Sequence, residues 1–322
     1  MQVNGWKAGA FLLCATLLAG NTVSAQSYPG RPIRMVTSAP GGSSDFAARL
    51  VAQGLASGLG QQVIIENRGG GVAAIEIVAK ALPDGYTLLY YGSILWLLPL
   101  MQEAKSYDTL RDFAPVALAV TSPNIVLVHP GVQAKSIKEL IAVAKSRPGA
   151  LNYGSGGAGS SGHLAAELFK SMAGVDMVRI PFKGSGPALT ALIAGEIQVL
   201  MSSAGGMSAH IKAGRVRALA VTSAKRSASL PDLPTVAEAG IPGYEYGQMS
   251  GVFAPAKTPA AIVSRLSQET VRAANTADIK EKLFSAGVDA APNSSPREFT
   301  AQIKSEISRL GKVIKDAGIR SE

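Results

Sequence analysis

The chain is poor in cysteine, histidine and aromatic residues, and each shortage excludes a class of protein. Its 322 residues include one cysteine, Cys14, and three histidines, which are too few for a disulfide scaffold or a cysteine–histidine metal centre. Aromatic residues make up 6% of the chain and are not interleaved with the basic residues, whose only adjacent pair is Lys225-Arg226. The formal net charge is +9, but this distribution lacks the footprint of a nucleic-acid-binding surface. The positive surface either steers small anions toward the protein or has no specific partner.

The N-terminus carries an apolar run, Ala8 to Gly20, that is too short to span a bilayer. Lys7 precedes this run, and Val23-Ser24-Ala25 offers small residues at a cleavage position. We therefore expect residues 1–25 to be a signal peptide that is removed, together with Cys14. An exported chain without cysteine fits a bacterial periplasm better than a small secreted scaffold.

From residue 32 onward, short apolar segments alternate with amphipathic ones. Strands are expected at 33–37, 62–66 and 86–90, and helices at 46–59 and 73–81. Ser44 or Asp45 is placed to cap the first helix. Strand–helix units of this spacing predict an α/β fold with a mostly parallel sheet, flanked by helices, that binds ligands at the carboxyl ends of its strands. Ser43, Ser93 and Ser155 all fall at that edge.

The second half of the chain repeats this alternation. Strands are expected at 125–128, 152–153, 177–182, 198–202, 218–222 and 251–254, and helices at 137–145, from 164, and at 188–194, 259–275, 277–286 and 296–317. The strands near 125 and 250 would connect two lobes. We predict one lobe from 26–125 and 251–322, a second from 126–250, and a hinge of two crossings.

Two glycine- and serine-rich turns resemble each other. The segment Gly159 to Leu168 repeats the pattern of Gly42 to Leu50 with one residue inserted. A strand–helix turn of this kind leaves the amides of the first helical turn unpaired at the positive end of the helix dipole, which favours an anion. Either turn alone would more often be an ordinary helix cap than a binding site, since serine favours that position. Two such turns at strand ends indicate that two lobes grip one anion.

Two classes of enzyme fit the motifs poorly. Gly154 to Gly159 has the G-x-G-x-x-G spacing of a dinucleotide site, but the following strand leads into Lys183 instead of an acidic residue. The G-x-S-x-G motif of serine hydrolases is absent. His163 either packs against its helix start or contacts a ligand, whereas His129 and His210 are isolated in the sequence. No transition-metal site is expected.

Several segments, taken in order, resemble the Bug-type periplasmic solute-binding proteins, the substrate-binding components of tripartite tricarboxylate transporters. They are Tyr28 to Arg34, Pro40 to Asp45, Val63 to Arg68, Ala79 to Leu88, Leu151 to Ser155, Pro181 to Gly184 and Leu230 to Gly240. The resemblance implies a two-lobe type II periplasmic-binding fold that closes on its ligand without catalysis or a cofactor. It also implies that the two turns clasp a carboxylate, partly through water.

The predicted ligand-binding residues follow from this resemblance and from the strand-edge rule. They are Gly41, Gly42, Ser43, Ser44, Asp45, Ser93, Ser155, Gly159, Ser160, Ser161, His163, Lys183, Gly184 and Ser203. Ser203 stands near a position where the family often has an acidic or amide residue, which favours plain carboxylic acids over amino acids. Residues 93–98 are unusually apolar, so they either contact an aromatic or apolar ligand body or simply pack in the core.

We therefore predict a monomeric periplasmic receptor, not an enzyme, that binds a small di- or tricarboxylate or an aromatic acid. Its expected partner is a membrane transporter, and no nucleic acid or metal is expected. A receptor that serves a sensor instead of a permease remains the main alternative. A dinucleotide-dependent or hydrolytic enzyme is the more distant one.

Overall fold

A computed structural model describes residues 28–38, 40, 43–69, 72–182, 184–203, 207–227, 230–291 and 294–320. The predicted signal peptide, residues 1–25, lies outside these ranges. Within them, no helix combines the length and the apolar character needed to cross a bilayer.

The first sheet contains the early strands of the chain. Strand β1 (Ile33–Thr37) pairs in parallel with β2 (Val63–Asn67) and with β3 (Thr87–Gly92), and β3 pairs antiparallel with β9 (Gly247–Pro255). The first half of β4 (Phe113–Val128) continues the sheet beyond β9, and β10 (Asp289–Ala290) pairs with β4. This part of the sheet is mixed, since its parallel strands are bordered by antiparallel ones.

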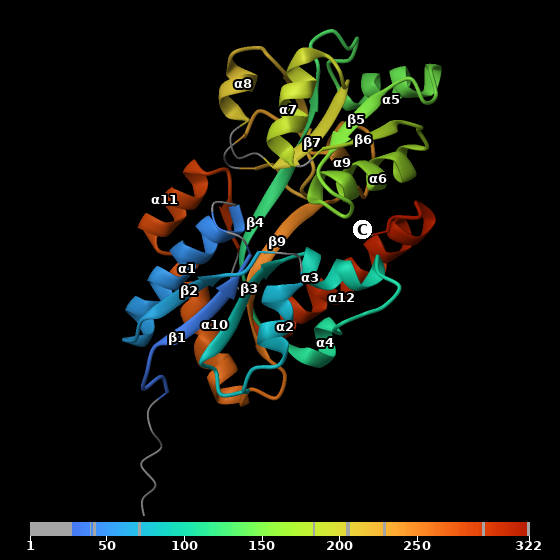
Figure 1. Cartoon of the computed structure of the whole chain (residues 1–322). Coiled ribbons are helices and arrows are strands. Elements are labelled where there is room, and N and C mark those ends of the chain that lie inside the picture. Colours follow the sequence, from blue (N-terminus) through green and yellow to red (C-terminus); the bar gives the residue numbers. More distant parts are fainter. Residues whose placement is uncertain are drawn as a thin grey trace, which may run out of the picture.

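Helices cover both faces of this sheet (Figure 1). Met35 of β1 belongs to a buried cluster with residues of α1 (Ser43–Leu59), α10 (Ala260–Ala274) and α11 (Ala277–Ser285). The next residue, Val36, belongs to a cluster with α2 (Ala73–Ala79), α3 (Ile94–Leu97) and α12 (Pro296–Asp316). Successive side chains of a strand point to opposite faces, so β1 is apolar on both sides. The short segments α4 (Thr109–Asp112) and η1 (Leu98–Leu100) accompany α3.

The second half of β4 begins another set of strands. It pairs antiparallel with β7 (Val199–Ser203) and β8 (Arg217–Val221), while β5 (Asn152–Ser155) lies parallel to β7 and to β6 (Val178–Pro181). The helices here are α5 (Ile137–Ser146), α6 (Ser161–Ala173), α7 (Ser185–Ala194), α8 (Ser208–Lys212) and α9 (Val236–Ala239). In Figure 1, α7 and α8 lie on one side of these strands and α5 and α6 on the other.

Strands β4 and β9 run between the two halves of the molecule (Figure 1). The partner of β4 changes from β9, which pairs up to Pro123, to β7, which pairs from Asn124 onward. The predicted lobe boundary near residue 125 falls close to this change. The sequence predicted only residues 125–128 as a strand. The rest of β4 was not predicted because it contains Pro115 and Pro123, and proline is rare inside strands. The register of β4 against β9 is irregular just after Pro115.

One local prediction is wrong. The first helix was expected from Phe46, with Ser44 or Asp45 as its cap, but α1 begins at Ser43. Ser44 and Asp45 therefore lie within the first helical turn, where a carboxylate interacts favourably with the helix dipole.

Candidate functional site

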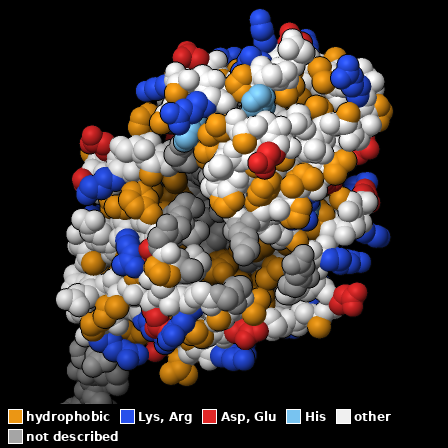
Figure 2. Space-filling model, turned by 45° about the horizontal axis from the view of Figure 1, so that its top comes forward, with side chains coloured by type: hydrophobic (Ala, Val, Ile, Leu, Met, Phe, Trp, Pro, Cys, Tyr) orange, Lys and Arg blue, Asp and Glu red, His pale blue; other side chains and the backbone are white. Residues whose placement is uncertain are grey.

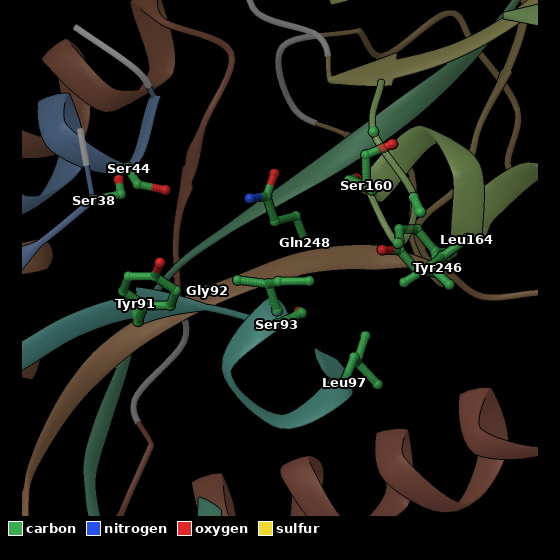
Figure 3. A pocket seen from close by; sticks show the side chains of 15 residues that line it. Ser38, Ser44, Tyr91, Gly92, Ser93, Leu97, Ser160, Leu164, Tyr246 and Gln248 are labelled. Carbon is green, nitrogen blue, oxygen red and sulfur yellow. The ribbon is translucent and has the colours of Figure 1, made fainter. Parts of the chain in front are cut away.

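A cavity of about 330 Å³ lies where elements of the two sheets face each other. The face shown in Figure 2 is hollowed, and hydrophobic side chains are exposed in the hollow. In Figure 3, Ser38 and Ser44 lie on one side, Ser160, Leu164 and Tyr246 on the other, and Ser93 and Gln248 between them. The full described lining is Ser38, Ser44, Tyr91, Gly92, Ser93, Ile94, Leu97, Gly157, Ala158, Gly159, Ser160, Ser161, Leu164, Tyr246 and Gln248.

The first wall contains Ser38, which follows β1, and Ser44 at the start of α1. Asp45 is 6% exposed, and its carboxylate accepts a hydrogen bond from Asn67 Nδ2 at 2.7 Å and pairs with Arg49 Nε at 3.1 Å. Asn67 Nδ2 also donates to the carbonyl oxygen of Ser38. Asp45 thus connects the start of α1 to the end of β2. Of the neighbours Ser44 and Asp45, Ser44 lines the cavity.

The opposite wall is the loop between β5 and α6. Ser160 is the N-cap of α6, but its hydroxyl makes no capping bond and is buried without a hydrogen-bond partner among the described residues. The N–H of Gly159 donates to Nδ1 of the buried His163 at 3.1 Å. Burial, helped by Arg179, lowers the pKa of His163 to about 4. The neutral imidazole therefore holds the loop, and the Gly159 amide is not free for a ligand.

Arg179 supports the same loop from β6. Its Nε donates to Ser155 Oγ at 2.8 Å, and its Nη2 donates to the carbonyl oxygen of Gly156 at 3.0 Å. Ser155 is 1% exposed and does not line the cavity. The guanidinium group of Arg179 thus hydrogen-bonds to the backbone and to a hydroxyl group of the loop, and these bonds fix the shape of the wall.

Ser161 connects α6 to the strands that run between the two sheets. Its hydroxyl is hydrogen-bonded to the buried Asn124 of β4, at 2.8 Å from Nδ2, and to the Tyr246 hydroxyl ahead of β9. Burial raises the pKa of Tyr246, so this phenol stays protonated near neutral pH. The start of α6 is therefore anchored to β4, which runs between the two halves of the molecule (Figure 1).

The segment 93–98 both packs in the core and faces the cavity. Leu95, Trp96 and Leu97 are all buried, and Leu97 lines the cavity together with Ile94. Gly159, at φ +73°, lies so close to Met101, which follows η1, that a Cβ there would lie 2.5 Å from Met101 Sδ and 3.7 Å from Ile94 Cδ1. Elements of the two sheets thus meet at an apolar contact beside the cavity.

The predicted site residues fall into four groups. Ser44, Ser93, Gly159, Ser160 and Ser161 line the cavity, and Asp45, Ser155 and His163 lie behind the lining in the contacts described above. Gly184, which precedes α7, and Ser203, which pairs with Asn124, do not line it. Gly41, Gly42, Lys183 and the side chain of Ser43 lie outside the described residues.

Other residues that line the cavity were not predicted from the sequence. Ser38 and Gly92 fall at the ends of predicted strands, so the rule that pointed to Ser43 and Ser93 could have found them. Tyr246 and Gln248 lie at the start of β9, which the sequence predicted only from Gly251, and no motif marks them.

The chemistry of the cavity is that of neutral donors and apolar walls. Its described lining includes no Lys, Arg, Asp or Glu. Among the described residues, no group of three or more acidic, histidine or cysteine side chains could hold a metal ion. A bound anion would therefore be stabilised by hydroxyl groups, the Gln248 amide and the first-turn amides of α1 and α6.

Comparisons with known proteins agree with this architecture. Residues 47–319 match the family described as Tripartite tricarboxylate transporter family receptor. The structure of R. palustris Rpa4515 with adipate is 36% identical, covers 91% of this chain and 99% of that one, and has a TM-score of 0.77. MatC of Rhodopseudomonas palustris with bound malate is 31% identical over 89% of this chain and 100% of that one, with a TM-score of 0.74. Protein BugT of Bordetella pertussis is 35% identical over 318 residues, 97% of this chain and 96% of that protein.

The predicted α/β fold of periplasmic-binding-protein type is confirmed by these structures. The predicted family is confirmed by both the sequence match and the relatives. The chain therefore belongs to the tripartite tricarboxylate transporter family receptors, which are periplasmic solute-binding proteins and not enzymes.

Proposed function

We propose that this protein captures a small organic carboxylate in the 330 Å³ cavity and delivers it to a membrane transporter. The observation that carries the proposal is the pairing of two helix starts, those of α1 and α6, across a cavity whose described lining bears no charge. A hydrogen bond to a charged group contributes roughly 1.5–3 kcal/mol. Three or four such bonds offset the cost of removing a carboxylate from water.

Within this proposal the predicted residues act in different ways. Ser44, Ser93, Ser160 and Ser161 contact the ligand, and the unpartnered hydroxyl of Ser160 supports that role. Asp45, Ser155 and His163 hold the turns in shape. We assign Gly41, Gly42 and Ser43 to the first of these turns by their sequence positions. Lys183 and Gly184, between β6 and α7, and Ser203 are assigned to additional parts of the wall.

The lining favours a carboxylate with an apolar or aromatic body. Ile94, Leu97 and Leu164 line the cavity together with the rings of Tyr91 and Tyr246. The described lining offers no carboxylate to pair with an ammonium group, so amino acids are disfavoured. The ligands of two relatives, adipate and malate, are carboxylates without an ammonium group.

Capture would proceed by a hinge motion on β4 and β9, with residues 26–125 and 251–322 as one lobe and 126–250 as the other. A ligand that contacts both helix starts stabilises the closed state relative to the open one, which is the requirement for ligand-driven closure. We also propose that the protein acts as a monomer. Residues 1–25 would direct its export to the periplasm and would then be removed.

Calorimetric titration with adipate, malate, benzoate and glutamate tests ligand capture. We expect at least one of the first three acids to bind, and to lose at least tenfold in affinity in Ser44→Leu and in Ser160→Leu. Ser285→Leu is the matched control, because Ser285 is exposed on α11 and its hydroxyl bonds only within that helix. Unchanged affinity in both cavity variants would overturn the proposed site, and binding of glutamate alone would overturn the ligand class.

Transport and sensing are separated by a second experiment. Deleting the gene from its host should abolish uptake of the radiolabelled acid if the protein serves a transporter. Normal uptake with a lost transcriptional response would establish the sensory alternative instead.

A further inference from the structure

A buried carboxyl group lies directly behind the wall of the cavity. Glu306 of α12 is 4% exposed, and its Oε2 accepts a hydrogen bond from Trp96 Nε1 at 2.5 Å. The Ser93 hydroxyl, which accepts a hydrogen bond from the Met249 N–H at 3.2 Å, also lies close enough to this carboxyl group to stabilise its ionised form. Ser93 lines the cavity, so one hydroxyl group separates Glu306 from a ligand bound there.

The carboxyl group also faces Tyr246, the other lining residue near α12. Tyr246 in turn is hydrogen-bonded to Ser161 at the start of α6. Glu306 is therefore linked through one side chain to each wall of the cavity, by Ser93 on the first-sheet side and by Tyr246 on the second-sheet side.

No full ion pair within 4 Å neutralises Glu306 among the described residues, unlike Asp45 or Glu167. The charged or titratable groups that face it are Arg309 on its own helix, Glu245 and Tyr246 ahead of β9, and Lys225, Arg226 and Asp289 across a second cavity. From β3 and α3, Ser93 and Trp96 bring no charge. Arg309 donates to the backbone carbonyl oxygen of Glu245, and its attraction does not outweigh burial, which raises the pKa of Glu306 to about 7.

A second cavity, separate from the ligand cavity, gives protons access to Glu306. Glu306 also lines the second cavity, of about 520 Å³, together with Ser122, Gln302 and Arg309. A proton can therefore reach the carboxyl group without passing through the ligand.

We propose that Glu306 is a positioning residue of the binding cavity that takes up a proton when a carboxylate ligand binds beside Ser93. An ionised Glu306 would repel the incoming carboxylate across the Ser93 hydroxyl in a water-poor environment. A protonated Glu306 keeps its hydrogen bond from Trp96 and can donate its own proton toward the Ser93 hydroxyl, which then donates to the ligand. This inference rests on the proposed function and names a regulation of the same site.

The expected pH dependence follows from linkage. Since the ligand raises the pKa of Glu306 above 7, bound and free protein are both protonated below that pH, and affinity is flat there. Above pH 7 the free protein loses the proton that the complex retains, so Kd rises by up to about tenfold per pH unit. Glu306→Gln, which retains an acceptor for Trp96 Nε1, should flatten this profile.

The test is calorimetric titration with adipate and benzoate from pH 6.5 to 8.5, in two buffers of different ionisation enthalpy. We expect uptake of up to one proton per ligand near pH 7.5 in the wild type and in the control variant Glu196→Gln, and none in Glu306→Gln. Glu196 is the control because it is an exposed acid that lines neither cavity. Should Glu306→Gln fail to fold, Trp96→Phe, which removes the donor to Glu306, should shift the pH at which proton uptake is largest; an unchanged profile, or no uptake in the wild type, would overturn the proposal.

The outcomes separate the two proposals. Binding with pH-independent affinity and no proton uptake overturns the role of Glu306 and leaves carboxylate capture intact. The same proton uptake in Glu306→Gln as in the wild type also overturns it. A failure of every acid in the panel to bind at any pH overturns the proposed function, and the coupling with it.

Discussion

The turns that open α1 and α6 share a sequence pattern but are held in shape by different means. At α1, the acidic residue Asp45 is paired with Asn67 and with Arg49, whose side chain is 54% exposed. At α6, the half-buried Arg179 and the buried His163 bond to the loop backbone itself. An arginine supports the start of each helix. Only at α6 does the arginine hydrogen-bond to loop groups, the Ser155 hydroxyl and the Gly156 carbonyl oxygen, that lie away from water. We therefore expect the α6 turn to be the more sensitive of the two to mutation.

Removing Arg179 should have the largest effect. Arg179→Met removes two hydrogen bonds from a charged donor, one to Ser155 Oγ and one to the carbonyl oxygen of Gly156, which keeps only its bond from the Ser155 hydroxyl. A hydrogen bond to a charged group contributes about 1.5–3 kcal/mol. We expect the free energy of unfolding to fall by about that amount and the affinity for the bound acid to fall at least tenfold. Urea denaturation and calorimetry measure the two effects. A variant with wild-type affinity would show that this loop is not preorganised by Arg179.

His163 should make the α6 turn sensitive to acid. Its pKa of about 4 lies below the ordinary value of 6.5, so the unfolded state binds more protons between these values and stability is lost as pH falls from 6.5 toward 4. The loss is at most about 3 kcal/mol. His163→Gln retains an acceptor for the Gly159 amide and should remove most of this acid sensitivity, as measured by thermal melts at pH 4.5 and 7.

Glu306 titrates in the opposite sense and provides an internal check on that experiment. Its pKa is raised from 4.5 to about 7, so its contribution to stability is complete below pH 4.5 and is lost as pH rises toward 7. Once His163→Gln has removed the histidine contribution, the Glu306 contribution remains, so this variant should become less stable as pH rises from 4.5 to 7. Equal acid sensitivity in His163→Gln and the wild type would contradict the assignment of a buried neutral imidazole.

The smallest effect is expected at α1. Arg49→Met removes an ion pair between an exposed arginine and the buried Asp45, and a hydrogen bond from Arg49 to Asn67 Oδ1, while the hydrogen bond from Asn67 to Asp45 remains. Ion pairs of solvent-exposed arginines contribute about 0–1 kcal/mol and Asp45 keeps its neutral donor, so stability should fall by about 1 kcal/mol and affinity by less than threefold. Denaturation and calorimetry beside Arg179→Met make the comparison direct. A larger loss in Arg49→Met than in Arg179→Met would reverse the ranking of the two turns.

The sequence predicted the strand ends and the paired turns because those features are local. Alternating apolar and amphipathic segments mark β1, β2, β3 and the helices between them, and glycine and serine mark the turns. Ser44, Ser93 and Ser160 were found in this way.

The supporting contacts could not be predicted, because they join residues far apart in the chain. Trp96 and Glu306 are 210 positions apart, and Asn124 and Ser161 are 37 apart. Arg179 is one of many scattered arginines until β6 is placed beside β5. The length of β4 was missed for the same reason: its prolines are tolerated only where neighbouring strands allow an irregular register.

A crystal structure with the tightest-binding acid of the panel tests the central claim most directly. We predict the ligand in the 330 Å³ cavity, with a carboxylate oxygen in contact with the first turn of α6 and with other ligand atoms in contact with Ser44 or Ser93 on the α1 side. A ligand found in the cavity lined by Arg309 and Lys225, or one that contacts residues of only one sheet, would contradict the account.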